Sequence, residues 1–545
     1  MTRKGIIGLV LILILVVQAV FLVTPVKAAT ITVTSKLDTA DPGNCRLRDA
    51  IAAANFNTAI GDCPAGSAGA DTIGFSLGLQ CNLVPCTITL TSALPTVTED
   101  LTINGNGTTI NGANAFRVFD FSAVTVNMSN LKIANANVSG SSFGGAISMS
   151  DGNLTLTNVF FSNDRAISGG AIYEAKGTLS VTNSNFSANI AGVGGDGGAI
   201  FNGSGSLSVT DSVFNNNSAV NGGGAIATTS GTSIINSTFS GNSAPLGGAI
   251  ENSSANLTVG NCVFDNNSSD FGGGAIAAFD STNIFNSTFS NNKAPGPSSL
   301  GGAVYFQSVG GALTITESTL FNNTSNNDGG AVYIVDGPMT LRNLTISSNS
   351  AKNNGGGIFI NETVQTPTTA FLNNLTITNN LADSDNDANG DGGGIFRATG
   401  TAQVQNSIIA GNHDTPGNAG AGSINPDCSG SFSSQGHNLI GINDGCSGYT
   451  NGANGDKVGN GASPINPLLG ALANYGGLTQ THSLIPGSPA IDAGNPLPPG
   501  GGGFTCAGTD QRNVTRPQGA ACDMGAVEHR VGEIIIFVYL PAILK

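Results

Sequence analysis

Large hydrophobic residues recur along this chain at intervals of 25 to 32 residues, and each is followed three positions later by an asparagine. The nine pairs are Phe186/Asn189, Phe214/Asn217, Phe239/Asn242, Phe264/Asn267, Phe289/Asn292, Leu320/Asn323, Ile346/Asn349, Ile377/Asn380 and Ile409/Asn412. A second marker, Gly-Gly-Ala-Ile or Gly-Gly-Ala-Val, keeps step with the first and begins at Gly144, Gly169, Gly197, Gly223, Gly247, Gly273, Gly301 and Gly329. Two markers with one shared period are typical of a repeat protein, in which each unit buries its apolar face by stacking on its neighbours.

One repeat, residues 169–189, contains three short β-prone runs joined by Gly, Ser and Asn residues. Residues 179–182 alternate apolar and polar side chains, as a strand with one buried face does. The repeats have no helical periodicity, which disfavours leucine-rich and tetratricopeptide solenoids, and their period is too short for a propeller blade of about 40 residues. We therefore predict an all-β fold: a right-handed, single-stranded parallel β-helix of about 11–13 coils, roughly 50 Å long, with an N-terminal helical cap and an irregular C-terminal domain.

The asparagine of each repeat has a physical role in such a coil. Strands stack about 4.8 Å apart, so like residues lie directly above one another. An asparagine that points inward at a corner can donate its amide NH₂ to the asparagine carbonyl of the next coil, and the ladder satisfies itself when every coil contributes. The alternative is that asparagine is simply common here and favours turns. The fixed offset in nine consecutive coils favours the ladder.

The paired glycines of the second marker predict another corner, where a positive φ or a close backbone approach excludes a Cβ atom. The repeats also contain Asn-x-Ser/Thr sequences such as Asn236-Ser237-Thr238. We interpret these as structural positions and not as glycosylation sites.

The first 28 residues have the features of an export signal. Arg3 and Lys4 precede an apolar stretch over residues 5–23, and small residues lie before a cleavage position near Ala28. The stretch is also long enough to span a bilayer, so an uncleaved anchor is the alternative. Without Arg3, Lys4 and Lys27 the formal net charge changes from −15 to −18. Such an acidic surface argues against nucleic acid or anionic membrane as a partner, because both favour basic patches.

Eight of the nine cysteines form close sequence pairs outside the regular repeats, which favours an oxidising compartment and local disulfides. The pairs, assigned from proximity alone, are Cys45/Cys63, Cys81/Cys86, Cys428/Cys446 and Cys506/Cys522. Cys262 replaces the serine of equivalent repeats, and we interpret it as a small buried free thiol. None of the spacings suits zinc.

Residues 45–55 are the clearest helical segment of the chain, because Leu47, Ile51 and Ala54 share one helix face. We predict that this helix caps the rod, since exposed strand edges recruit other chains. Residues 45–51 resemble the CSLREAI motif found near the N-terminus of many exported bacterial β-helix proteins, with Arg46 in place of Ser and Asp49 in place of Glu.

Two further resemblances cover most of the remaining chain. The Gly-Gly-Ala-Ile and Phe-x-x-Asn repeats resemble those of chlamydial polymorphic outer membrane proteins, a family of β-helical adhesins and autotransporters. The C-terminal region is similar to the choice-of-anchor domain of bacterial surface proteins, which typically precedes varied cell-surface anchors. This similarity rests on residues 466–470, 476–479, 486–494, 510–512 and 523–528.

These features divide the chain into a signal peptide (1–28), an N-terminal cap (29–86), β-helix repeats (87–425), a choice-of-anchor-like domain (426–530) and an apolar tail (531–545). The tail has eleven apolar residues, too few for a membrane span. We expect it to be a sorting signal, with a terminal strand as the alternative. We expect no transmembrane barrel in this chain, because many strands of about ten residues would find no room, so it departs from autotransporters.

Catalysis is the rival hypothesis, because parallel β-helices include pectin lyases and polygalacturonases. Polysaccharide cleavage needs paired carboxyl groups, or a base together with charge stabilisation. The acids of the repeats are scattered, mostly at corners, and form no evident pair: Asp211, Glu251, Asp265, Asp280, Glu317 and Asp336. Basic residues are sparse, the four histidines lie at or beyond the last coils, and no Gly-x-Ser-x-Gly sequence occurs. We therefore predict no catalytic residue and no enzymatic activity, with a polysaccharide lyase or glycoside hydrolase as the alternative.

An acidic loop interrupts the repeat rhythm and carries the one metal hypothesis. Its candidate ligands are Asp383, Asp385, Asp387, Asn389 and Asp391. Oxygen ligands at alternating positions followed by Gly390 match the opening of a calcium loop, but Phe396 stands where the closing bidentate Glu is expected. A solvated acidic loop is the alternative, and we expect no other cofactor.

Together these features predict an exported protein, extracellular or at the cell surface, with a structural or adhesive role. Its long rows of Ser, Thr and Asn side chains suit weak multivalent contact with the cell envelope or with extracellular glycans and proteins. The sequence leaves the oligomeric state open.

Overall fold

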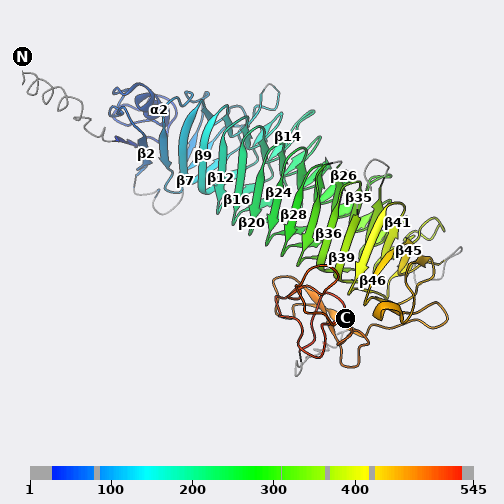
Figure 1. Cartoon of the computed structure of the whole chain (residues 1–545). Coiled ribbons are helices and arrows are strands. Elements are labelled where there is room, and N and C mark those ends of the chain that lie inside the picture. Colours follow the sequence, from blue (N-terminus) through cyan, green and yellow to red (C-terminus); the bar gives the residue numbers. More distant parts are fainter. Residues whose placement is uncertain are drawn as a thin grey trace, which may run out of the picture.

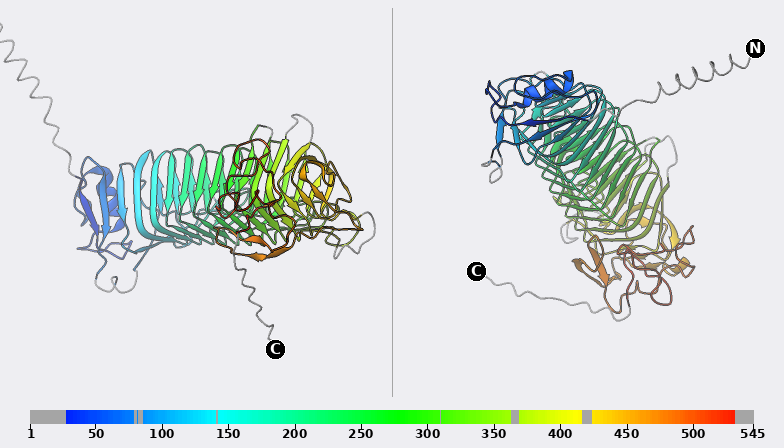
Figure 2. Two further views of the ribbon diagram at one scale, coloured as in Figure 1. Left: turned by 60° about the horizontal axis from the view of Figure 1, so that its bottom comes forward. Right: turned by 90° about the vertical axis from the view of Figure 1, so that its left-hand side faces the viewer.

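A computed structural model describes residues 28–78, 81, 86–140, 142–308, 310–362, 369–415 and 424–530. All but the last residue of the predicted signal segment, and the whole apolar tail, lie outside these described residues. The described residues form a long rod of stacked coils, with the N-terminal cap at one end and the C-terminal region beside the other (Figures 1 and 2).

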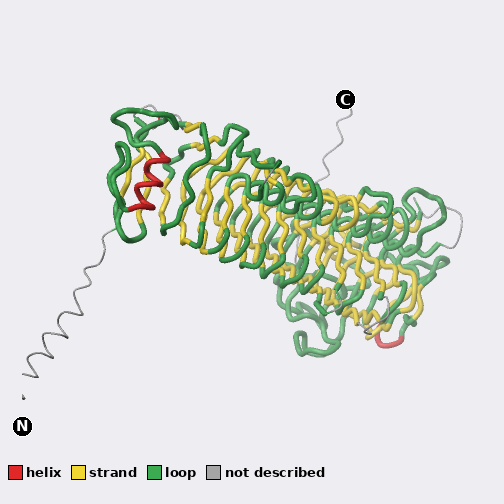
Figure 3. The backbone as a smooth tube through the Cα atoms, turned by 90° about the horizontal axis from the view of Figure 1, so that it is seen from above, coloured by secondary structure: helices red, strands yellow, loops and turns green. Residues whose placement is uncertain are grey.

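Each regular coil contains four short strands. In one coil, β11 (Ile172–Glu174) leads to β12 (Thr178–Thr182), β13 (Asn185–Ser187) and β14 (Ile190–Ala191). Equivalent strands of successive coils pair in parallel and in register, so that Phe186 pairs with Phe161 on one side and Phe214 on the other. Among the described residues these pairs build three sheets of 26, 13 and 10 strands along the rod (Figure 3). The predicted parallel β-helix is confirmed, with about 12 turns.

The two-residue strands such as β14 were not predicted. They follow directly after the repeat asparagine and are too short to show the alternation that marks a strand in sequence. In the structure they form the smallest of the three sheets.

Apolar side chains fill the rod in columns that run along its axis. Phe161, Phe186, Phe214, Phe239, Phe264 and Phe289 are fully buried and stack with ring centroids 4.6 to 4.9 Å apart. The spacing equals the distance between neighbouring strands, so the rings inherit the register of the sheet. Leu320, Ile346 and Ile377 continue the column in later coils.

The glycine marker lies at a corner, as predicted. Gly169 has a φ of 60°, and a Cβ atom on Gly170 would lie 2.2 Å from the carbonyl oxygen of Gly198 in the next coil. The first glycine is therefore required by backbone conformation and the second by close approach.

Two outward corners of each coil also have a left-handed backbone. The first corner, between the two strands that each coil adds to the largest sheet, has a φ of 48° at Asn183, 52° at Asn236 and 53° at Asn261. The second corner follows the next strand, with a φ of 54° at Asn216. Asparagine tolerates this conformation because its short amide can hydrogen-bond locally. The left-handed backbone at this corner therefore accounts for the asparagine of the Asn236-Ser237-Thr238 sequence.

The N-terminal cap contains the predicted helix, α2 (Leu47–Phe56). Leu47, Ile51 and Ala54 are buried against β1 (Thr30–Val33) and β2 (Asp71–Phe75), which form the first parallel pair of the largest sheet. The helix packs at the end of the rod (Figure 1).

The coils continue past residue 425, where the sequence placed the end of the repeats. β45 (Cys428–Ser431), β46 (Ser433–Gly436), β47 (Leu439–Ile440) and β49 (Lys457–Val458) still pair in parallel with the preceding coils or with one another. The paired-glycine marker is lost there, because Pro426 and Asp427 stand where the preceding coil has Gly393 and Gly394, so the sequence boundary falls early. The remaining described residues, up to residue 530, contain one pair of antiparallel strands, β50 (Leu469–Ala473) and β51 (Thr481–Leu484), and lie along the side of the rod (Figure 2).

Candidate functional site

The nine predicted ladder asparagines lie in one column along the axis, and each is at most 2% exposed. In order along the rod they are Asn189, Asn217, Asn242, Asn267, Asn292, Asn323, Asn349, Asn380 and Asn412. In a typical step, Oδ1 of Asn242 accepts both the backbone N–H and the side-chain Nδ2 of Asn217, each at 3.0 Å. Nδ2 of Asn217 also donates to the backbone carbonyl of Phe186 at 3.0 Å. Both side-chain polar atoms thus have a partner in a neighbouring coil, as a buried amide requires.

The same pair of hydrogen bonds repeats at every step of the column, at 2.8 to 3.1 Å. The steps after Asn242 join Asn242 to Asn267, Asn267 to Asn292, Asn292 to Asn323, Asn323 to Asn349, Asn349 to Asn380 and Asn380 to Asn412. The geometry persists where the hydrophobe of the pair changes from Phe289 to Leu320, because the amide bonds to backbone and to its own kind. All nine predicted asparagines therefore point inward and act as structural groups of the rod.

An aspartate stands at each end of this column, which the asparagine pattern did not predict. Oδ1 of Asp427 accepts the backbone N–H and Nδ2 of Asn412, both at 2.9 Å, and its Oδ2 accepts the N–H of Ile442 at 2.7 Å. At the other end, Oδ2 of Asp164 has no hydrogen-bond partner among the described residues. Burial raises the pKa of Asp427 to about 7 and the pKa of Asp164 well above its ordinary value. Asp164 could have been found from the sequence, because it lies three residues after Phe161, at the spacing of the hydrophobe–asparagine pairs.

A second inward column is polar in the coils near the N-terminus, and sequence reasoning missed it. Glu174, Asn202, Thr228 and Asn252 are fully buried and in register with one another. Both carboxyl oxygens of Glu174 lack a hydrogen-bond partner within the described residues, and burial raises its pKa to about 7. A carboxyl group in this setting keeps its proton to near-neutral pH.

Several charged side chains on the lateral faces form ion pairs. Arg342 donates to Glu317 at 3.2 Å, and Lys176 donates to Asp151 at 3.0 Å. Asp265 instead accepts from neighbouring amide and hydroxyl groups. Exposed pairs of this kind contribute little to stability.

Glu251 and Asp196 form a different arrangement on the outer face of the 13-stranded sheet. Oε1 of Glu251 accepts the hydroxyl of Ser253 at 3.0 Å, and Oδ1 of Asp196 accepts the N–H of Gly222, also at 3.0 Å. Burial raises the pKa of both carboxyl groups, and the negative charge of Asp196 raises that of Glu251 further. The sequence spacing gave no sign of this neighbourhood, because the two acids belong to coils two turns apart.

The predicted calcium loop brings three of its five residues together. One ligand oxygen from each of Asp383, Asp385 and Asp387 lies within 4.8 Å of the other two. Asp383 is buried and accepts the backbone N–H groups of Asp387 and Ala388 at 2.9 and 3.2 Å. Asp385 also pairs with Lys352 at 3.7 Å. The loop is thus held by its own hydrogen bonds as well as offering carboxylate oxygens.

The other two predicted ligands have separate contacts. The backbone N–H of Asn389 donates to Asp387 at 3.0 Å, and Asp391 accepts Nδ2 of Asn425 at 2.6 Å. Phe396, at the position of a closing glutamate, stacks on Phe359 at 5.1 Å. The donor set therefore fits a calcium site in part: three carboxylates converge, but the closing bidentate ligand is replaced by an aromatic ring.

All four disulfides predicted from proximity are formed: Cys45–Cys63, Cys81–Cys86, Cys428–Cys446 and Cys506–Cys522. Cys262 is free and buried, and burial raises the pKa of its thiol to about 11. Its Sγ accepts the N–H of Ser237 at 3.4 Å, in the place where the preceding coil uses the Ser237 hydroxyl to accept from Ser212. The thiol therefore substitutes for a structural hydroxyl.

The C-terminal region is built around two buried ion pairs. Arg512 pairs with Asp510 at 2.8 Å and Arg516 with Glu528 at 2.9 Å, and all four side chains are at most 1% exposed. The backbone N–H of Glu528 also donates to Asp510 at 2.9 Å. Residues 510–512 and 523–528, singled out in the sequence, therefore form one charged core.

This region docks on the side of the rod through polar contacts. Nε2 of Gln511 donates to the carbonyl of Ser318 and the hydroxyl of Thr319, and its Oε1 accepts the hydroxyl of Thr345. Nε2 of His482 lies 2.9 Å from the hydroxyl of Ser347. An open cleft of about 550 Å³ lies at the edge of the docked region. It is lined by Asn286, Glu317, residues 476–478 and residues 509–513.

The cleft contains two carboxyl groups, but one of them is fully engaged. Both oxygens of Asp510 accept hydrogen bonds from Arg512, and they also accept from the backbone N–H groups of Val514 and Glu528. A carboxylate with these partners and no exposure is a structural group and not a base or nucleophile open to a substrate.

Four segments of the chain, residues 211–229, 261–278, 286–307 and 317–335, match the Chlamydia polymorphic membrane protein repeat. Each begins at a first-corner residue, so the matched unit corresponds to part of one coil. No curated protein and no solved structure matched the chain significantly. The repeat resemblance is thus confirmed, while the resemblances of the N-terminal motif and the C-terminal region stay predictions.

Within the part of the chain that the structure describes, no helix is long and apolar enough to cross a membrane.

Proposed function

We propose that this chain is an exported β-helical rod displayed at the cell surface, where it serves as a structural and adhesive element without a catalytic centre. The observation that carries the proposal is the set of four polymorphic-membrane-protein-type repeat segments within one parallel β-solenoid. Its buried asparagine column finds its hydrogen-bond partners within the rod, so the lateral faces are left for contact. These faces are rich in Ser, Thr and Asn, which suits many weak contacts with glycans or proteins.

Two measurements test this proposal. Cell fractionation, with mass spectrometry of both mature termini, should find the processed protein in the surface or extracellular fraction. Purified protein should bind a subset of glycans or extracellular proteins on an array. A purely cytosolic location contradicts the display, and surface location without any binding would leave a passive layer component.

Polysaccharide cleavage is the second candidate, and Glu251 beside Asp196 is the observation that favours it. A carboxyl group with a raised pKa next to a second carboxyl group is the arrangement that acid catalysis of glycoside hydrolysis uses. Reducing-end and unsaturated-product assays on a polysaccharide panel test it. Activity that Glu251→Gln abolishes and Glu317→Gln leaves intact would establish catalysis and overturn the non-enzymatic proposal.

Calcium binding at Asp383, Asp385 and Asp387 stays a prediction. We expect millimolar calcium to raise the melting temperature of the protein relative to a chelator, and Asp385→Asn with Asp387→Asn to remove that rise. An unchanged melting temperature ends the idea.

A further inference from the structure

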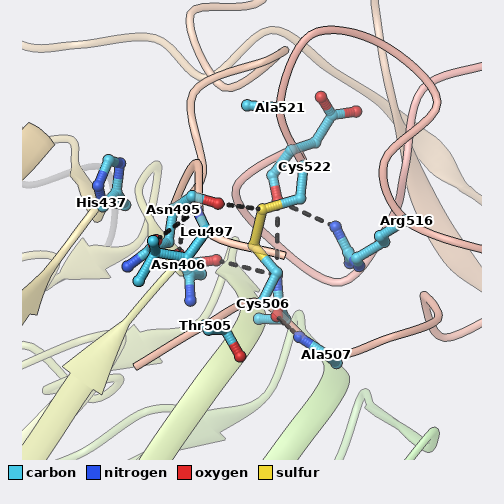
Figure 4. Close-up of a disulfide and its surroundings, with 12 residues drawn as sticks. Asn406, His437, Asn495, Leu497, Thr505, Cys506, Ala507, Arg516, Ala521 and Cys522 are labelled. Carbon is cyan, nitrogen blue, oxygen red and sulfur yellow. Dashed lines mark hydrogen bonds between the residues drawn. A yellow bond between two sulfur atoms is a disulfide. The ribbon is translucent and has the colours of Figure 1, made fainter. Parts of the chain in front are cut away.

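The first corner of the last coils is already a binding surface for polypeptide, because the C-terminal region lies on it. Oδ1 of Asn374 accepts the backbone N–H of Ala507 at 2.8 Å, and Nδ2 of Asn343 donates to the carbonyl of Thr509 at 2.8 Å. Asn406 accepts the N–H of Asn495 at 2.9 Å (Figure 4), and it also donates to the carbonyl of Phe504. The three asparagines are at most 1% exposed.

These contacts use only the main chain of the docked region. Residues 503–509 offer successive carbonyl and N–H groups to first-corner asparagines and their neighbours, including Nδ2 of Asn373, which donates to Thr505 at 3.0 Å. A side-chain amide presents one donor and one acceptor as a peptide group does, so it can bind a chain irrespective of that chain's side chains.

The same corner continues uncovered toward the N-terminus. Asn183, Asn236 and Asn261 are exposed and Asn286 is half-buried, with Asp211 between the first two. Their φ angles of 48° to 53° match the 49° to 54° of Asn343, Asn374 and Asn406. The amides therefore repeat at the same corner and in the same backbone conformation as those that hold residues 503–509.

A neighbouring column shows the same contrast between covered and uncovered coils. Thr345, Thr376 and Ile408 are at most 2% exposed beneath the C-terminal region. In register with them, Val213 and Val263 are 37% and 40% exposed in the uncovered coils. Apolar side chains thus lie beside the exposed amides, as Ile408 lies beside the buried ones.

We propose that the uncovered first corner from Asn183 to Asn286 binds an extended, uncharged polypeptide segment of a partner protein through the partner's main chain. The inference rests on the proposed adhesive function and names the class of its partner. Continuity with the intramolecular interface favours polypeptide over glycan. A second copy of this chain is disfavoured, because its residues 503–509 are already docked and two chains of net charge −15 repel each other.

The open cleft marks where such a segment would meet the docked region. Asn286 and Glu317 form its floor on the rod, and Leu478, which is 74% exposed, lies on the side of the C-terminal region. One apolar side chain of the partner would pack against Leu478, while its main chain continues along the corner.

Biolayer interferometry on the full mature protein tests the proposal. The probe is a peptide with the sequence of residues 500–509 carrying Cys506→Ser, displayed densely so that weak contacts add. The test variant replaces the corner amides with glycine, which keeps the left-handed backbone: Asn236→Gly, Asn261→Gly and Asn286→Gly. The matched control makes the same change at the second corner: Asn216→Gly, Asn266→Gly and Asn291→Gly.

We expect the wild-type protein and the second-corner control to bind the peptide alike, and the first-corner variant to bind at least tenfold more weakly. Absence of binding, or equal loss in both variants, overturns the proposal. So does displacement of the peptide by an uncharged oligosaccharide, or a concentration-dependent dimer in sedimentation velocity that the first-corner variant abolishes. Because purified protein is used, failure here leaves the fractionation result, and hence surface display, untouched.

Discussion

The regular coils and the C-terminal region bury polar groups in opposite ways. In the coils, Asn217 is satisfied by Asn242, the same residue type one turn further on. In the C-terminal region, Arg516 pairs with a single group of opposite charge, Glu528, and donates to two backbone carbonyls. Repetition makes each coil one of many similar contributors. A unique ion pair concentrates the stability of its region in a few atoms.

The sharpest way to break this comparison is Arg516→Met. Removing one partner of a buried pair leaves Glu528 charged without its cation, and such changes cost about 3–5 kcal/mol. We expect the C-terminal region to unfold first in urea while the circular dichroism of the coils persists. Limited proteolysis at each urea concentration separates the two events. The exposed pair gives the control, since Lys176→Met should leave both transitions in place; a single unshifted transition in Arg516→Met would refute the unique role of the pair.

Asn242→Ala interrupts the column in the middle of the rod. The backbone N–H and Nδ2 of Asn217 and the carbonyl of Phe214 lose their partner, which should lower the free energy of unfolding by about 3 kcal/mol. Chemical denaturation measures this loss. The exposed Asn256→Ala in the neighbouring coil should change the midpoint little, and equal effects of the two variants would mean that the buried column contributes nothing special.

Glu174→Gln sharpens the comparison, because Glu174 is a buried group in the coils without a partner in its neighbours. The pKa of Glu174 is raised to about 7 in the native state, whereas the ordinary carboxyl pKa of 4.5 applies to the unfolded state. Between these two pH values the native state therefore holds a proton that the unfolded state has released. Native stability therefore falls as pH rises from 4.5 through 7. At pH 8 the variant should exceed the wild type by about 2 kcal/mol, and at pH 4 the two should converge. An advantage that grows toward acid pH would have the wrong sign for this explanation.

Asp164→Asn makes the smallest change and extends the column by one residue. An amide in place of the carboxyl group gives the unpartnered Oδ2 position a donor toward Asn189, and we expect a gain of about 1 kcal/mol. Burial raises the pKa of Asp164, so the gain should grow above the ordinary carboxyl pKa and shrink in acid. Asp427→Asn is the matched control at the other end of the column. Its NH₂ would face the N–H of Ile442, which is also a donor. The melting temperatures of the two variants should therefore move in opposite directions.

The sequence predicted the coils because their physics is local and repeated. The geometry of one coil sets four features of the sequence: the period, the glycine corners, the Phe186-type hydrophobes and the asparagine three residues later. Because the coils stack, the same features recur in every repeat. The four disulfides were accessible for the same reason, since each joins cysteines at most 18 residues apart. The strand after Asn189 was missed because two residues carry no readable alternation.

Contacts between distant parts of the chain could not be predicted in this way. Gln511 meets Ser318 across 193 residues, and nothing in either local pattern encodes that meeting. The neighbourhood of Asp196 and Glu251 depends on how two separated coils superpose. The sequence did not reveal that Glu174 points inward. An inward position is recognised by apolar residues at the equivalent positions of other coils, and the coil of Glu174 has a polar residue there.

The lateral docking of residues 503–509 has a mechanical consequence. Coils are joined by hydrogen bonds that run along the rod, so tension along that direction separates the coils one after another. The docked segment contacts the coils of Asn343, Asn374 and Asn406 and therefore holds these three coils together. Under tension the molecule should extend first in the uncovered coils around Asn236 and Asn261, and the covered coils should separate only at higher force.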